Sequence, residues 1–189
     1  MSDGERMSLS FATVLAGKVV DELGSVCERI EIAGSIRRKK PTIGDVEIVC
    51  IPKLVTMTNL LGETITKREP DDIAARLIVS GFRLLKNGDH FKQAQLADGG
   101  VKFDIFITTP ECWGVIFTIR TGSADFSHRL VTTRQQGGLL PSNLRVKDGR
   151  IWHGETALST PEESDVFAVL GMAWIDPEQR GGHNHDHTT

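Results

Sequence analysis

The chain has 189 residues, of which 39% are hydrophobic and 25% are charged, and its formal net charge is −3. This is the composition of an ordinary globular protein, long enough for one large domain or two small ones. No apolar run reaches the roughly 20 residues that span a bilayer, and the N-terminus lacks the basic start and apolar core of a secretory signal. The weakly acidic balance also means that any surface for binding phosphates must be local.

Three widely separated cysteines, Cys27, Cys50 and Cys112, fit neither a disulfide framework nor the spacing of a zinc site. We therefore expect reduced thiols in a cytoplasmic protein.

Helical and strand-like patterns alternate through residues 1–109, which predicts an α+β domain with a mixed sheet and flanking helices. The expected elements, in chain order, are a helix at 8–23, strands at 29–34 and 45–51, a Thr- and Gly-rich loop at about 53–69, a helix at 70–81, and strands at 90–97 and 100–108. The last two strands are separated by Asp98-Gly99-Gly100, a strong hairpin signal.

The pattern changes at Pro110, and we expect a second, smaller domain at 110–180, followed by a disordered tail at 181–189. The expected elements are a helix through Trp113 that breaks at Thr121-Gly122, a helix from Ser123 to Gly137-Gly138, a hairpin at 143–154 and a C-terminal helix with Thr160 as N-cap, Pro161 at its first position and Glu163 completing a capping box.

Acidic residues occur on two of the predicted strands. Side chains alternate along a strand, so Asp45 and Glu47 share one face, and Asp104 occupies the polar face of a later strand. If these two strands are neighbours, three carboxylates converge, and a divalent cation such as magnesium would offset their repulsion. The alternative is that these acids simply line the solvent-exposed face of a sheet.

A basic segment directly precedes the first acidic pair. Gly34-Ser35 follows a strand, and Arg37, Arg38, Lys39 and Lys40 come next. Backbone N–H groups in such a turn can bind an anion, and arginine adds bidentate contacts to phosphate. A solvated basic loop is the alternative. A phosphate-binding turn beside metal-binding acids would together suit phosphoryl transfer.

The segment "GSIRRKKPTIGDVEIV" resembles the nucleotidyltransferase signature of family X DNA polymerases, the polymerase beta and lambda group: Gly-Ser-x-Arg-Arg followed by Gly-Asp-x-Asp. "VKFDIFI", "RTGSADFSHRL" and "STPEESDVFAVLGMAWIDPEQR" resemble later segments of the same family, so the resemblance covers about residues 5–180. It implies a nucleotidyltransferase palm at 1–109, then a helix-hairpin-helix-rich nucleotide-binding subdomain at 110–180. It also implies a minimal form without the family's N-terminal lyase domain.

By matching position, the resemblance implies roles for individual residues. Asp45, Glu47 and Asp104 would bind two Mg²⁺ ions, with Mn²⁺ as a possible substitute, and Asp104 would accept the proton of the primer 3′-hydroxyl. The residues expected to bind the nucleotide are Gly34, Ser35, Arg38, Gly44, Arg6, Arg120, Thr121, Gly122 and Ser127. Lys102 would contact the primer backbone.

The implied function is DNA polymerase activity, in which a dNTP is added to the 3′-end of gapped or primer-template DNA in repair. We expect a monomer without membrane contact, with nucleoid association or a viral origin open. Glu47 stands where the family has aspartate, and Ile119-Arg120 replaces its Tyr-Phe pair. These departures leave two alternatives open: template-independent transfer to a nucleic-acid end, small molecule or protein, and a catalytically weak module that binds DNA ends.

Overall fold

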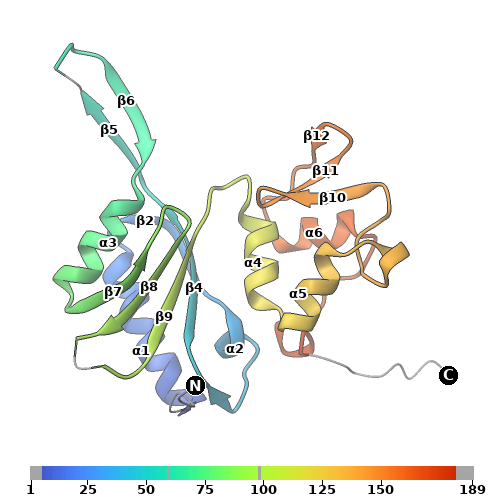
Figure 1. Ribbon diagram of the computed structural model, residues 1–189, viewed down its shortest axis with the longest axis horizontal. Coiled ribbons are helices and arrows are strands. Elements are labelled where there is room, and N and C mark those ends of the chain that lie inside the picture. Colours follow the sequence, from blue (N-terminus) through green and yellow to red (C-terminus); the bar gives the residue numbers. More distant parts are fainter. Residues whose placement is uncertain (1–5, 59, 98, 182–189) are drawn as a thin grey trace. The chain divides into compact units, whose positions relative to one another are not determined.

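The computed structural model describes residues 6–58, 60–97 and 99–181, and the chain divides into two compact units (Figure 1). The first unit comprises residues 1–32 and 41–109, and the second comprises 33–40 and 110–189. The change at Pro110 is thus a structural boundary, but residues 33–40 group with the C-terminal segment. The tail expected at 181–189 lies outside the described residues, apart from Gly181. The fold is α+β, as the sequence predicts.

A five-stranded mixed sheet forms the centre of the first unit, in the strand order β2-β4-β9-β8-β7. The bounds are Cys27–Ile32 for β2, Val46–Pro52 for β4, Phe82–Asn87 for β7, Phe91–Leu96 for β8 and Lys102–Ile107 for β9. Strands β4 and β9 are parallel, whereas the other neighbours are antiparallel. Residues far apart in the sequence therefore meet at the central β4–β9 pair.

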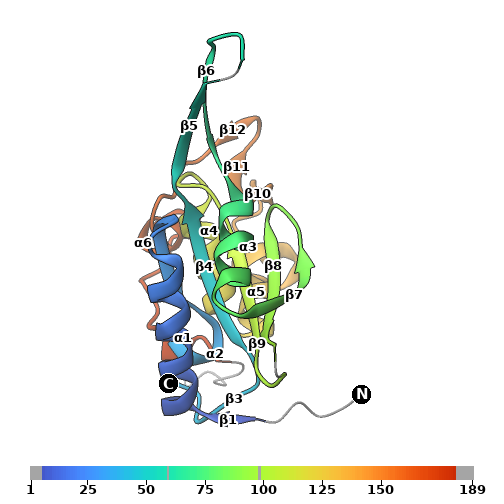
Figure 2. The same ribbon diagram turned by 90° about the vertical axis from the view of Figure 1, so that its left-hand side faces the viewer.

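Two helices, α1 (Leu9–Leu23) and α3 (Pro70–Val79), cover one face of this sheet (Figure 2). Ser8 caps α1 by accepting a hydrogen bond from the Phe11 N–H, and Pro70 occupies the first position of α3. The helical spacing predicts the buried Val19 and Leu23 of α1, but Phe11 and Val14, expected on the same apolar face, are exposed. The residues buried by α1 and α3 are Ala12, Ala16, Val19, Leu23, Ile73, Ala74 and Leu77.

The loop expected at 53–69 is instead a hairpin of β5 (Leu54–Thr58) and β6 (Thr64–Arg68), which projects from the first unit (Figure 1). The loop prediction is wrong because the β-branched Thr, Val and Ile of this segment favour strands. Strand β7 and the short β1–β3 pair (Met7–Ser8 and Thr42–Ile43) are also not among the elements predicted from the sequence.

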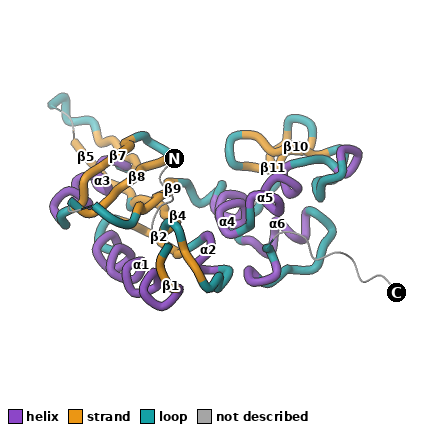
Figure 3. The backbone as a smooth tube through the Cα atoms, turned by 60° about the horizontal axis from the view of Figure 1, so that its bottom comes forward, coloured by secondary structure: helices purple, strands orange, loops and turns teal. Residues whose placement is uncertain are grey.

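The second unit packs helices on a small antiparallel sheet (Figure 3). Its elements are α2 (Gly34–Arg37), α4 (Trp113–Thr121), α5 (Ala124–Val131), η1 (Arg134–Gln136), β10 (Leu144–Lys147), β11 (Arg150–His153), β12 (Thr156–Ala157), α6 (Glu163–Val169) and η2 (Pro177–Gln179). The apolar core includes Val115, Leu130, Ile151, Val166 and Phe167. The hairpin around Asp148-Gly149 forms as predicted.

Two helix boundaries in this unit differ from the sequence predictions. Helix α5 ends at Val131, and Gly137-Gly138 forms a separate turn in which a Cβ on Gly138 would lie 1.9 Å from the Thr132 carbonyl oxygen. Helix α6 is capped by Glu162, not Thr160. Glu162 and Asp165 form the capping box, and Gly114 of α4 lies close to the carbonyl groups of Thr160 and Glu162.

Candidate functional site: a carboxylate pair and an arginine-linked nucleotide segment

Glu47 and Asp104 lie side by side at the centre of the first unit. They are register partners in the parallel β4–β9 pair, so their Cα atoms are about 5 Å apart. Both side chains are half-buried, while the alternating residues Val46, Ile48 and Ile105 are fully buried on the helix-covered face. The convergence of acids from two distant strands, on which the sequence argument depended, is therefore present for this pair.

Asp45 is placed differently from the prediction. It lies in a bend just before β4 and is exposed, so it does not share a strand with Glu47. Within the described residues, no group of three His, Cys, Asp or Glu side chains is arranged to hold a metal ion. Strand pairing therefore brings together two of the three predicted carboxylates, and Asp45 lies two residues before Glu47 in the chain. Their oxygen chemistry still suits a hard divalent cation such as magnesium, which prefers carboxylate ligands.

A glutamine that the sequence analysis did not select completes this region. Gln93 on β8 is the register partner of Asp104, and its Nε2 donates to Asp104 Oδ1 at 2.8 Å. In the sequence, Gln93 and Gln95 alternate with Lys92 and Ala94 along a predicted strand, which places the two glutamines on one face but assigns them no function. Lys102 is exposed on the same face of β9 as Asp104, two residues earlier.

Arg6 and Gly44, both expected at the nucleotide phosphates, lie near each other in the first unit. The antiparallel β1–β3 pair ends with Met7 opposite Ile43, and Arg6 and Gly44 are the next residue on each chain segment. Both are exposed, and Gly44 directly precedes Asp45.

The segment expected to be a phosphate-binding turn is a single helical turn, α2, in the second unit. Gly34 begins it with a φ of +59°, which favours glycine, and Ser35 is half-buried. The half-buried Arg37 is bound within the unit: its Nη1 donates to Thr121 Oγ1 at 2.6 Å, and its Nη2 donates to Glu163 Oε2 at 2.6 Å. The guanidinium also lies 4.0 Å from the Phe117 ring centroid.

Glu163 joins Arg37 to a second arginine. Arg180 is fully buried, and its Nη1 donates to Glu163 Oε1 at 2.5 Å. Burial alone would raise the pKa of Glu163, but the hydrogen bonds from Arg37 and Arg180 outweigh it and hold this pKa below its ordinary value. Burial lowers the pKa of Arg180. This ion triad fixes α2 against the helices of its own unit.

Arg38 connects α2 to the other predicted nucleotide residues. Its Nη1 donates to the carbonyl oxygens of Thr121 and Gly122, at 2.7 and 2.8 Å. Thr121 is fully buried, and a Cβ on Gly122 would lie 2.5 Å from the Phe126 ring, so this turn requires glycine. The Ser127 hydroxyl donates to the Ile119 carbonyl at 2.5 Å.

The second unit therefore brings together several of the predicted nucleotide residues. They are Gly34, Ser35, Arg38, Thr121, Gly122 and Ser127, with Arg120 half-buried next to Thr121. The Thr121 hydroxyl accepts a hydrogen bond from Arg37 and the Ser127 hydroxyl donates one to Ile119, so both side chains already contact protein groups. Lys39, which follows Arg38, forms an ion pair with Glu178 at 2.5 Å, and that hydrogen bond raises the Lys39 pKa.

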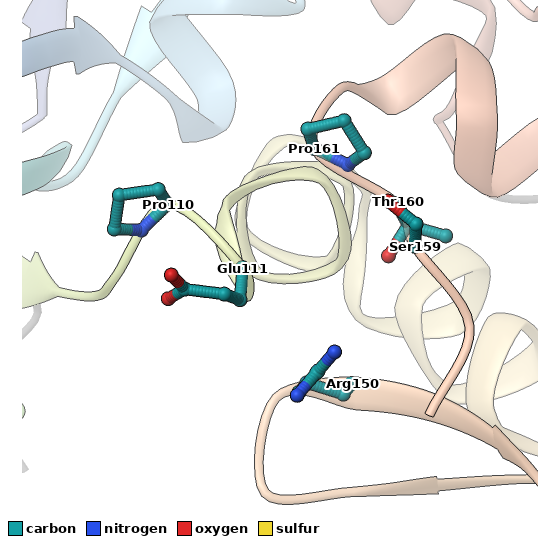
Figure 4. A pocket seen from close by; sticks show the side chains of 6 residues that line it. All are labelled: Pro110, Glu111, Arg150, Ser159, Thr160 and Pro161. Carbon is teal, nitrogen blue, oxygen red and sulfur yellow. The ribbon is translucent and has the colours of Figure 1, made fainter. Parts of the chain in front are cut away.

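A pocket of about 190 Å³ lies elsewhere in the second unit (Figure 4). It is lined by Pro110, Glu111, Arg150, Ser159, Thr160 and Pro161. None of these residues is among the predicted site residues, so the pocket gives no support to their roles.

Comparisons with known proteins agree with this architecture. Residues 117–181 match the family model of the DNA polymerase beta thumb. The crystal structure of Leishmania infantum polymerase beta, in a ternary P/T complex, is similar with a TM-score of 0.70 and 16% sequence identity. The similarity covers 94% of this chain and 77% of that one. A search of curated protein sequences finds no match.

Proposed function

We propose that this chain, which has a family X polymerase-like fold, is a nucleotidyltransferase that adds a deoxynucleotide from a dNTP to a DNA 3′-hydroxyl. The observation that carries the proposal is the in-register pair of Glu47 and Asp104. The polymerase beta thumb match over 117–181 and the polymerase beta-like fold support it. Gap filling in DNA repair is the reaction that we consider first.

Asp45, Glu47 and Asp104 are the proposed ligands of two Mg²⁺ ions, which Mn²⁺ could replace. Such ions neutralise charge on the phosphates and on the attacking oxygen. Asp104 accepts the proton of the primer 3′-hydroxyl. The 3′-oxygen then forms a bond to the α-phosphorus of the dNTP, and the bond to the pyrophosphate leaving group breaks.

The nucleotide-binding roles that the family resemblance implies are kept in this proposal. Gly34, Ser35 and Arg38 bind the β- and γ-phosphates, and Arg6 and Gly44 have the same proposed role. Thr121 and Gly122 line the sugar and base through their backbone, because the Thr121 side chain is buried and bonded to Arg37. Ser127 and Arg120 are also proposed to contact the nucleotide, and Lys102 is proposed to contact the primer backbone.

Extension of a primer across a one-nucleotide DNA gap tests this proposal, with each of the four templating bases and with Mg²⁺ or Mn²⁺. We expect the wild-type chain to add the complementary nucleotide and Asp104→Asn to reduce the rate at least 100-fold, because the proton acceptor is lost. Asp89→Asn is the matched control, since Asp89 is an exposed acid in the same unit. No extension by the wild type, or equal rates for wild type and Asp104→Asn, would refute the proposal.

The second candidate is template-independent nucleotidyl transfer. Two features favour it: the Asp-x-Glu motif formed by Asp45 and Glu47, and the net charge of −3. The same assay separates it from the first: addition to single-stranded ends, with no preference set by the templating base, would identify template-independent transfer. Lack of addition together with binding to DNA ends would identify a non-catalytic end-binding module.

We expect the protein to act as a monomer on gapped DNA in the cytoplasm. None of the helices in the described part of the chain is long and apolar enough to cross a membrane.

A further inference from the structure

Three polar side chains form a row across three adjacent strands of the first unit. Glu47 on β4 is opposite Asp104 on β9, and Asp104 is opposite Gln93 on β8. Asp104 is therefore flanked by a carboxylate on one strand and by an amide on the other. The Gln93 amide donates to Asp104 Oδ1 at 2.8 Å, within the range of a strong charge-assisted hydrogen bond.

This hydrogen bond has two consequences for Asp104. It holds Oδ1 and so restricts rotation of the carboxylate, while Oδ2 and the second lone pair of Oδ1 can still take a metal ion or a proton. It also supplies a donor on the side of Asp104 opposite to Glu47, which partly offsets the repulsion between the two negative charges. Partners behind a metal ligand commonly have this orienting role, and their loss costs 10–100-fold in metal affinity or activity, as an order of magnitude.

We propose that Gln93 is a positioning residue, which acts through Asp104 to set the metal affinity and the activity of the carboxylate pair. The inference rests on the proposed function of Asp104 but adds a residue that the sequence motifs do not include. Gln93 is half-buried, and the adjacent residues Lys92 and Ala94 supply the buried side chains of β8, so core packing does not account for it.

The same strand offers a matched control. Gln95 is two residues from Gln93, so it lies on the same face of β8, and it is likewise half-buried. Its amide donates to the Gly100 carbonyl at 2.7 Å and not to a carboxylate. Methionine has nearly the volume of glutamine but no amide donor. Gln93→Met and Gln95→Met therefore make the same chemical change, and only the first removes a bond to Asp104.

The first measurement is the affinity for Mn²⁺ without DNA or nucleotide. The electron paramagnetic resonance signal of the free ion monitors the binding. We expect Gln93→Met to raise the dissociation constant about tenfold and Gln95→Met to change it less than twofold. In the Asp104→Asn background, Gln93→Met should have no further effect, because a residue that acts only through Asp104 is silent once that carboxylate is gone.

The second measurement is single-nucleotide gap filling at saturating DNA. Gln93→Met should lower kcat about tenfold and change the KM for dNTP less than threefold, because the amide touches the carboxylate and not the nucleotide. Raising the Mg²⁺ concentration should recover part of the rate. A general loss of folding would not recover in this way.

The outcomes separate this inference from the proposed function. Wild-type levels of Mn²⁺ binding and kcat in Gln93→Met, with an active wild-type chain, would overturn the role of Gln93 and leave the polymerase proposal intact. An additive effect in the Asp104→Asn background would also overturn it. A wild-type chain that neither binds Mn²⁺ nor extends DNA would refute the proposed function itself. If circular dichroism shows Gln93→Met to be unfolded, Gln93→Ala, which also removes the donor, takes its place.

Discussion

Replacing Glu163 with glutamine removes the carboxylate that joins Arg37 to Arg180 in the second unit. Glu163 accepts one hydrogen bond from each arginine, at 2.6 and 2.5 Å, and its side chain is only 8% exposed. Glutamine has the same shape, but it carries no charge, and its NH₂ group would face one of the two guanidinium donors. Arg180, whose side chain is 0% exposed, would keep its charge without a carboxylate partner.

The expected loss of unfolding free energy is about 3–5 kcal/mol, the cost of breaking a buried ion pair by removing one partner. Most of this comes from Arg180, since Arg37 is 23% exposed and solvent screens its pair with Glu163. Glu155→Gln is the matched control in the same unit. The Glu155 side chain is 95% exposed and pairs with Arg145 at the surface, so its removal should cost less than about 1 kcal/mol.

The two variants should also differ in their dependence on pH. The pKa of Glu163 lies below its ordinary value of 4.5, so the ion triad stabilises the fold fully above pH 4.5. This contribution is lost as the pH falls through the lower, folded-state pKa, because the folded protein then takes up the proton less readily than the unfolded chain. Glu163→Gln should remove this part of the acid sensitivity, whereas Glu155→Gln should retain it.

Urea denaturation monitored by circular dichroism, at pH 7 and across the range below pH 5, measures both effects. Because the chain has two units, the transition of the second unit should be followed by the fluorescence of Trp113, Trp152 and Trp174, which all lie in it. A loss below 1 kcal/mol for Glu163→Gln at pH 7, or the same loss for both variants, would show that the triad does not hold the second unit together.

Two further predictions concern packing and charge. Gly114→Ala should destabilise the second unit by up to about 3 kcal/mol, because the new Cβ would lie 2.3 Å from the Thr160 carbonyl oxygen. Gly17→Ala is the control in α1, where a Cβ would lie in open space, and it should stabilise the first unit by about 0.5–1 kcal/mol. Thermal unfolding checks both signs, and equal shifts would contradict the packing. Lys102→Ala should weaken DNA binding and reduce the salt dependence of log K by about one unit, while Lys18→Ala, on helix α1, should leave it unchanged.

The sequence predicted which side chains share a face of a strand better than it predicted which strands lie next to each other. Alternation alone placed Glu47 and Asp104 on polar faces, because the side-chain period of a strand is two residues. It could not establish that β4 and β9 are adjacent, since parallel pairing joins residues 57 positions apart and depends on the whole sheet. The family resemblance supplied that expectation, and the register confirms it for this pair. The position of Asp45, outside β4, depends on where the ladder starts, which periodicity does not determine.

Predictions failed where tertiary packing competed with local signals. Thr160 has the local features of an N-cap, but α6 starts at Glu163 with Glu162 as its cap, and the backbone of 160–162 lies close against Gly114 of α4. In the basic run after Ser35, Arg37 makes a half-buried ion pair with Glu163 of its own unit, while the phosphate role of Arg38 stays a prediction. Charge patterns do not distinguish these uses, because both require an arginine next to a polar turn. Gln93 carried no motif and became visible only through its hydrogen bond to Asp104.

The rate at which a single nucleotide is incorporated into gapped DNA, measured against the Mg²⁺ concentration for wild type and for Asp104→Asn, tests the central claim most directly. The account predicts saturable activation of the wild-type chain by Mg²⁺, abolition by chelation with EDTA, and a rate for Asp104→Asn at least 100-fold lower at every Mg²⁺ concentration. Incorporation that persists in EDTA, or that is unchanged by Asp104→Asn, would contradict the claim that Asp104 and its neighbouring carboxylates perform the chemistry.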